Sequence, residues 1–262
     1  MTSPMWASRC ALSSRMEAEQ YEVMFRREDT HWWYAGMRQV ALAVLRQALA
    51  GHERLRVLDA GCGTGGTTIQ LREFGDVYGV DLVWEALLPA ASRGLTGRLA
   101  RGSIERLPFA SGSFDVATSF EVIYHAGVAD DVAALRELRR VVRPSGLLLL
   151  RLPAHDWLRG AHDRLVHTRH RYTKQEVGAK LRAAGFEPVQ LSWANSLLFP
   201  PAAAKRLLER FGSSETEEPD LWQPPAPLNA LLRALLAFER HALVRRMPFP
   251  VGLSVLAVAR AG

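Results

Sequence analysis

A glycine-rich turn is the first feature of this sequence that could support chemistry. The apolar run 56–60 leads into Gly61-Cys62-Gly63-Thr64-Gly65-Gly66, and helix-forming residues follow. Such a strand-to-helix turn lets a ligand approach the backbone closely, because glycine has no Cβ in the way. The spacing of Gly61, Gly63 and Gly66 also satisfies the dinucleotide fingerprint. The glycines therefore predict a nucleotide-like cofactor without choosing between the candidates.

Two aspartates narrow that choice. Asp59 lies two residues before the first glycine. A carboxylate there would repel the pyrophosphate of NAD, whereas it suits the sulfonium and ammonium groups of S-adenosylmethionine (SAM). Asp81 ends the next predicted strand, roughly twenty residues on, where a carboxylate can hold ribose hydroxyls. Both cofactors carry a ribose, so Asp81 indicates a nucleoside and Asp59 favours SAM.

Several motifs in order resemble the class I SAM-dependent methyltransferases. The resemblance covers about residues 55–193, and linked motifs are far more specific than one glycine-rich loop. The matching segments are the first motif at 57–65, Asp81, the "LPF…SFD" segment at 106–116, the stretch 121–125, and the helix and Pro-Gly turn at 135–146.

The resemblance implies a set of cofactor contacts. Asp59, Gly61 and Gly63 would line the methionine portion, Cys62 would contribute backbone, and Gly65 would shape the turn. Asp81 would bind the ribose and Leu82 would pack on adenine. Near the adenine amino group the family often has an acidic residue, but this chain has Ser103, followed by Ile104. A serine accepts a hydrogen bond less strongly than a carboxylate. Phe120 and Glu121 would lie beside the transferable methyl.

The acceptor side is predicted at the ends of the fourth and fifth strands, which face the ligand crevice in open α/β sheets. Methyl transfer from a sulfonium needs an aligned acceptor, and a hydroxyl acceptor also benefits from a general base. His125 is the first candidate for that base, with Tyr124 and His155 beside it. The alternative for His125 is a structural histidine that shapes the loop.

The aromatic run at residues 31–34 has two interpretations. It could anchor an N-terminal helix on the sheet, or form a lid with an aromatic face near the sulfonium. It resembles the N-terminal cap of many bacterial members of the family. Trp33 and Tyr34, together with His155, are therefore predicted to contact substrate or to belong to a lid.

Short apolar runs alternate with helical stretches along most of the chain. Strands are predicted at 56–60, 77–82, 98–104, 114–120, 147–152, 186–193 and 251–259; helices are predicted near 37–50, 67–74, 84–91, 132–142, 174–184, 202–211 and 228–246. This alternation predicts an α/β fold, with a mostly parallel sheet and helices on both faces. The resemblance makes it a seven-stranded Rossmann-like sheet whose last strand runs antiparallel, between the fifth and sixth.

The chain divides into five predicted segments. Residues 1–15 are predicted to be disordered, 16–51 a helical cap, 52–194 the SAM-binding core, 195–250 a helical insertion or lid, and 251–262 the final strand. The apolar helix at 228–246 could be a packed cap helix or the wall of a greasy acceptor site. It could also contact a membrane surface through Arg240, Arg245 and Arg246.

Composition constrains the partners. The net charge is +6, but 30 of the 33 basic residues are arginines, scattered among Asp and Glu. No Lys/Arg block marks a nucleic-acid tail, so such a partner is disfavoured. Two cysteines, Cys10 and Cys62, form no disulfide framework and no metal-ligand spacing. No run reaches the ~18 apolar residues of a membrane span, and the start lacks a secretory signal, so we expect a cytoplasmic protein.

The sequence thus predicts a SAM-dependent methyltransferase with a small-molecule or lipid-like acceptor and no metal. Three alternatives stay open: an RNA-modifying methyltransferase, a non-catalytic SAM-binding protein, and an NAD-dependent oxidoreductase. The accepting atom and the oligomeric state do not follow from these residues.

Overall fold

The computed structural model describes residues 21–51, 54–211 and 223–262, and it is built around one 7-stranded sheet. The strand order is β3-β2-β1-β4-β5-β7-β6. β7 pairs antiparallel with both β5 and β6, and the pairs among the first five strands are parallel. The predicted α/β class, the Rossmann-like sheet and the antiparallel last strand are confirmed. The strands are β1 (Leu55–Ala60), β2 (Gly75–Asp81), β3 (Leu99–Arg101), β4 (Phe114–Phe120), β5 (Val142–Pro153), β6 (Phe186–Ala194) and β7 (Ser254–Ala261).

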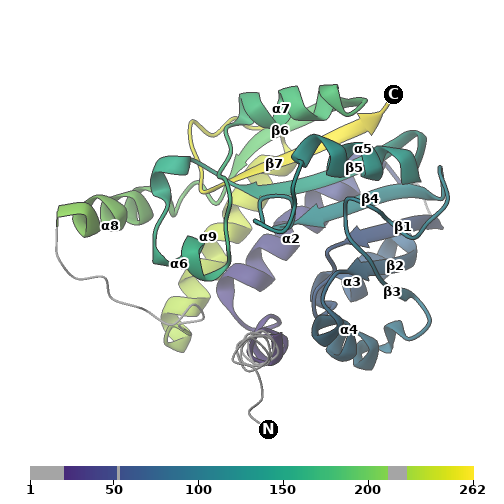
Figure 1. Ribbon diagram of the computed structural model, residues 1–262. Helices are drawn as coiled ribbons and strands as arrows, with labels where there is room; N and C mark the ends of the chain where they lie inside the picture. The colour runs from purple at the N-terminus through teal and green to yellow at the C-terminus, as the bar shows by residue number, and fades with distance from the viewer. Residues whose placement is uncertain (1–20, 52–53, 212–222) are drawn as a thin grey trace, which may run out of the picture.

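Helices cover both faces of this sheet (Figure 1). One face carries α5 and α7; the other carries α2, packed against α9, with α3 beside them. The helices are α2 (Trp32–Leu49), α3 (Gly66–Leu71), α4 (Trp84–Ala90), α5 (Asp131–Val141), α6 (Ala161–Leu165), α7 (Lys174–Ala183), α8 (Phe199–Phe211) and α9 (Ala226–Val244). None of the helices in the described ranges is long and apolar enough to cross a membrane.

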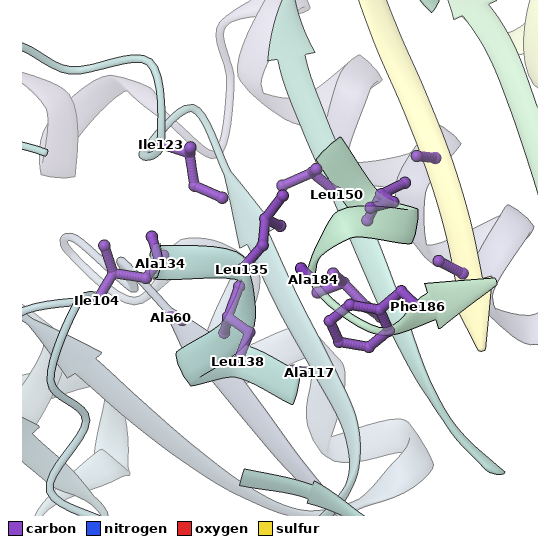
Figure 2. Close-up of a cluster of buried hydrophobic side chains, with 14 of the residues drawn as sticks. Ala60, Ile104, Ala117, Ile123, Ala134, Leu135, Leu138, Leu150, Ala184 and Phe186 are labelled. Carbon is purple, nitrogen blue, oxygen red and sulfur yellow. The ribbon is translucent and has the colours of Figure 1, made fainter. Parts of the chain in front are cut away.

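The core is continuous on each side of the sheet because the strands are apolar on both faces. Figure 2 shows one side, where Leu135 and Leu138 of α5 lie over Ala117 of β4 and Leu150 of β5. Phe186, at the start of β6, closes the same cluster. This packing holds the carboxyl ends of β1, β4 and β5 at one edge of the sheet.

Several element boundaries differ from the predictions. β3 is only Leu99–Arg101, so Ile104 lies after the strand and not within it. β5 begins at Val142, where a helix had been predicted to end, because Val142 pairs with Phe114 of β4. The short helix α6 was not predicted, since five residues carry too little periodicity. Residues 1–15, and the first part of the predicted cap at 16–20, lie outside the described residues.

The pairing of β1 and β2 at their N-terminal ends depends on one glycine. Gly75 starts β2 opposite Leu55 of β1, with a φ of 146°. A Cβ on Gly75 would come within 2.1 Å of the Leu55 carbonyl oxygen. The obstacle is backbone of the central sheet and cannot swing aside. Only glycine therefore allows the two strands to start side by side here.

We expect Gly75→Ala to lower the free energy of unfolding by about 3 kcal/mol or more, because a backbone clash adds to the dihedral strain. Gly94→Ala is the matched control, since Gly94 also has a positive φ (84°) but its Cβ would meet nothing within 4 Å. That variant should cost only about 1 kcal/mol. Urea denaturation of both variants measures the difference, and equal losses would contradict the clash.

Candidate active site

The glycine-rich turn leaves β1 with its amides directed at the neighbouring strand. The N–H groups of Gly61 and Cys62 donate to the carbonyl of Val80, at 2.7 and 3.0 Å. Gly61 and Gly63 have positive φ values of 85° and 51°, which L side chains rarely adopt. A Cβ on Gly61 would lie 2.1 Å from Val122 Cγ2. The turn is thus shaped by glycine and bordered by the loop that follows β4.

Asp81 ties the turn to the end of β2. Its Oδ2 accepts a hydrogen bond from the Gly63 N–H at 2.8 Å, and its Oδ1 accepts one from the Val83 N–H at 3.0 Å. Burial raises the pKa of this carboxyl, and the backbone donors oppose that shift. Each oxygen keeps a second lone pair, so the group can still accept hydroxyl hydrogens from a ligand. The structure therefore joins two of the predicted cofactor residues directly.

Asp59 lies behind the turn rather than on its surface. The residue is 2% exposed, and its two oxygens accept hydrogen bonds from Thr68 Oγ1 (2.7 Å) and Thr118 Oγ1 (2.8 Å). Burial raises the pKa of Asp59 to about 6. The prediction of direct contact with the cofactor stays a prediction, because both oxygens already bind α3 and β4. In this arrangement the carboxylate positions the turn.

The predicted adenine side contains one exposed, one half-buried and one buried residue. Leu82, directly after β2, is 56% exposed and can pack on a flat ring. Ile104 is buried, and Ser103 Oγ accepts a hydrogen bond from the Glu105 N–H at 3.2 Å. Cys62 is a free, buried thiol whose pKa is raised by burial, which makes it an inert filler and not a nucleophile.

At the ends of β4 and β5, an ion pair lies between aromatic rings. Glu121 has a φ of 58°, and its Oε1 accepts a hydrogen bond from Arg151 Nε at 2.9 Å. The Arg151 guanidinium carbon lies 5.2 Å from the ring centroids of both Trp33 and Phe120. Burial raises the pKa of Glu121, and Arg151 opposes that shift. Trp33 therefore reaches this edge from α2, as a lid residue must.

Tyr34 and Tyr124 lie close to the same carboxylate. Burial, with Glu121 and Glu28 nearby, raises the pKa of Tyr34 to about 12. Burial and Glu121 also raise the pKa of Tyr124 well above its ordinary value. Both phenols stay protonated at neutral pH, so Tyr124 can donate a hydrogen bond, and its predicted catalytic role stays a prediction.

The two candidate histidines occupy different environments. His125 is exposed; its Nδ1 accepts a hydrogen bond from the Gly127 N–H at 3.0 Å, and its ring meets His167 edge-on. His155 follows β5 with a φ of 60° and stacks on Trp193, with centroids 4.6 Å apart. Its Nε2 is buried and, among the described residues, has no hydrogen-bond partner.

The neutral form of His155 is favoured. Burial lowers its pKa, while a hydrogen bond with the Gly252 backbone opposes that shift. Because Nε2 has no partner, that bond uses the other ring nitrogen, which leaves the Nε2 lone pair available as a base. His155 thus combines an aromatic wall with a buried ring nitrogen that has no partner among the described residues, while His125 uses Nδ1 to hold its own loop.

One cluster around the turn was missed in the sequence analysis. Glu28 is 6% exposed, and its Oε1 accepts hydrogen bonds from Thr64 Oγ1 (2.5 Å) and Arg93 Nη2 (2.8 Å). Arg93 Nε also donates to the Thr64 carbonyl at 3.0 Å. A Cβ on Gly66 would meet Glu28 Oε2 at 2.1 Å, so this glycine serves close packing. No local pattern could indicate the cluster, since its members are up to 65 residues apart.

Known proteins resemble this chain over most of its length. The sequence model of the family described as "Methyltransferase domain" matches residues 58–150. A malonyl-acyl-carrier-protein O-methyltransferase of Pseudescherichia vulneris is 30% identical over 198 residues, which are 71% of this chain and 74% of that protein. One from Herminiimonas arsenicoxydans is 33% identical, covering 69% and 67%. The chain belongs to the SAM-dependent methyltransferases. Its cofactor is accordingly SAM, and it is a transferase of one-carbon groups.

Solved structures agree with the fold of this methyltransferase. A SAM-dependent methyltransferase of Thermotoga maritima superposes with a TM-score of 0.57 at 19% identity, covering 95% of this chain and 98% of that one. Phosphoethanolamine N-methyltransferase 2 of Haemonchus contortus, in complex with SAM, gives 0.54 at 19% identity, covering 84% and 52%. At these identities the likeness concerns the fold.

The residues at the turn fit SAM. Gly61 and Gly63 present backbone without side chains, Asp81 keeps free lone pairs for ribose hydroxyls, and Leu82 offers an exposed apolar surface for adenine. Carboxylates lie beside the turn, and they suit the positive sulfonium and ammonium groups of SAM. No group of three or more His, Cys, Asp or Glu able to hold a metal occurs in the described part of the chain.

Asp59 should leave a pH signature. Its pKa in the folded state, about 6, lies above the unfolded value near 3.8, so the folded state holds the proton more tightly. This contribution to stability is complete below pH ~4 and is lost as the pH rises through 6, by about 3 kcal/mol. Asp59→Asn should lack that loss.

Urea denaturation of ligand-free wild type and Asp59→Asn at pH 4, 5, 6 and 7 measures the effect. The difference between their unfolding free energies should shift in favour of the variant between pH 4 and pH 6, then stay constant. A difference independent of pH would show that Asp59 titrates normally. Asp76→Asn, an exposed aspartate on β2, controls for charge removal.

Proposed function

We propose that this enzyme methylates a small-molecule or lipid-like acceptor bound at the carboxyl edge of the sheet, beside Glu121, Tyr124 and His155. One observation carries the proposal: His155 presents an unpartnered basic nitrogen within an aromatic wall. Trp157 and Phe199 extend that wall, with centroids 6.2 and 5.5 Å from the His155 ring. An acceptor with an apolar body and a protic nucleophile matches this chemistry.

The cofactor side of the proposal uses the residues around the turn. Asp81 and the backbone of Gly61, Cys62 and Gly63 hold SAM, with Leu82 against adenine. Gly65, Ser103 and Ile104 shape the rest of that site, and Asp59 positions it. Phe120 and Glu121 lie beside the reacting methyl, and Trp33 and Tyr34 cover it from α2.

The chain's own residues have three tasks in the reaction. SAM supplies an electrophilic methyl group on a positively charged sulfur. Glu121, held by Arg151, places negative charge at the edge where that cation is bound. Trp33 and Phe120 exclude water around the ion pair. His155 accepts the acceptor's proton at Nε2, replacing His125 as our first candidate for the base.

The relatives support a small acceptor rather than a nucleic acid. Relatives that overlap about 70% of this chain carry the name malonyl-acyl-carrier-protein O-methyltransferase, and a C-methyltransferase of ubiquinone and menaquinone biosynthesis from Bdellovibrio bacteriovorus is 36% identical over 103 residues. The arginines around the site, Arg93, Arg151 and Arg171, are paired with carboxylates, which leaves little charge for a phosphate backbone. We place the enzyme in the cytoplasm.

Calorimetric titration with S-adenosylhomocysteine tests the cofactor site. Asp81→Ala should weaken binding at least about tenfold, because charge-assisted hydrogen bonds to the ribose are lost. Asp76→Ala, on the same strand but exposed and paired with Arg98, should bind like the wild type. Binding of NADH, or unchanged binding by Asp81→Ala, would overturn the assignment.

The base is tested once an acceptor screen has supplied a substrate. His155→Asn should lower kcat by roughly 10²- to 10⁴-fold at neutral pH, as expected when a general base is lost. His125→Asn is the matched control and should retain most activity. Both variants should bind S-adenosylhomocysteine normally. A loss confined to His125→Asn would return the role to that residue.

A further inference from the structure

α9 exposes an apolar stripe on the side turned away from the protein. Leu231 is 56% exposed and Phe238 is 66% exposed, and Arg245 follows them. These residues are spaced by seven, close to two helical turns, so they lie along one line of the helix. Leu228 begins the stripe at 38% exposure.

This stripe is not needed to hold α9 in place. The opposite side of the helix packs on α2, where Leu236 and Leu243 are almost fully buried and Leu236 lies against Gly36. Asn229 adds a hydrogen bond from the Trp32 N–H, at 2.9 Å. The outward leucines and Phe238 therefore expose apolar surface to water although the packing of α9 does not depend on them.

The exposed charges on α9 and just beyond it are all positive. Four arginines lie there, Arg233, Arg240, Arg245 and Arg246, and in the described part of the chain none of them forms an ion pair with a carboxylate. The one acidic residue of the helix, Glu239, is fully buried and accepts a hydrogen bond from the Ser196 N–H at 2.8 Å. Within the described residues, α9 thus presents positive charge without a carboxylate partner beside exposed apolar side chains.

We propose that this face of α9 docks on a membrane surface rich in anionic lipid. Exposed Leu and Phe with flanking arginines match the pattern of a helix that lies in the headgroup region. A nucleic acid would use the arginines but leave Phe238 and Leu231 without a partner. A second copy of the chain would bring like charges together without an exposed acid on either helix.

The helix α8 lies between this surface and the acceptor site in the chain. α8, which precedes α9 in the chain, projects beyond the carboxyl ends of the parallel strands (Figure 1). It exposes Leu207 (46%) and Leu208 (72%). Phe199, at the start of α8, touches the ring of His155. If the proposed function holds, docking of α9 brings the acceptor site to the membrane, and the acceptor is a lipid-borne molecule taken from the membrane surface.

Vesicle co-sedimentation of the full chain tests the surface without using the reaction. Vesicles of phosphatidylcholine with about one-third phosphatidylglycerol should bind the protein, pure phosphatidylcholine should bind it far less, and 0.5 M salt should weaken binding. Leu231→Ser with Phe238→Ser should lower the partition coefficient about tenfold or more. Arg245→Gln with Arg246→Gln should do the same on the anionic vesicles.

Matched variants control for general apolar and charge effects. Trp84→Ser with Leu88→Ser removes two side chains of similar exposure from α4, and Arg72→Gln with Arg136→Gln removes two exposed charges elsewhere. Both should bind like the wild type. No binding to anionic vesicles, equal losses in the controls, tighter binding to RNA, or a dimer in light scattering that α9 variants disrupt would each overturn the proposal. S-adenosylhomocysteine titration, unaffected by any of these variants, separates this outcome from a failure of the methyltransferase site.

Discussion

The hydrogen bond from the Gly63 amide to the Asp81 carboxylate is the constraint on which the cofactor side of the molecule depends. It joins the turn after β1 to the end of β2, the neighbouring parallel strand in the sheet. The N–H groups of Gly61 and Cys62 also donate to the Val80 carbonyl, so these backbone donors of the turn are hydrogen-bonded to the neighbouring strand. The backbone is thereby fixed before any ligand arrives, with Gly61 and Gly63 half-buried at its surface.

Buried carboxylates gather at the same edge of the sheet. Asp59, Glu28 and Glu121 all have raised pKa values because burial disfavours their charged forms. Each is offset by a different partner: threonine hydroxyls for Asp59, Arg93 for Glu28, and Arg151 for Glu121. Buried ion pairs add little net stability, so their concentration beside the turn fits a site built for a cationic cofactor.

The two halves of the site are built in different ways. The cofactor half uses backbone and short side chains at the carboxyl ends of β1 and β2. The acceptor half uses aromatic rings from β6, from α8 and from the turn after β5, around His155. Beyond it, α9 combines a packed inner face with an outer face that remains apolar and basic. The cofactor site therefore lies next to a surface suited to apolar acceptors.

The sequence by itself determined the fold class and the strand–turn–helix motif that contains the glycines, because these depend on neighbouring residues. Apolar runs and a glycine turn are local signals, and β4 was predicted to the residue. Only the tertiary structure decided that Asp59 binds Thr118, that Glu28 meets Arg93, and that Arg151 lies between Trp33 and Phe120. Those contacts join segments far apart in the chain. They exist because the strand order brings β1, β4 and β5 together and lays α2 over their ends, which no local pattern encodes.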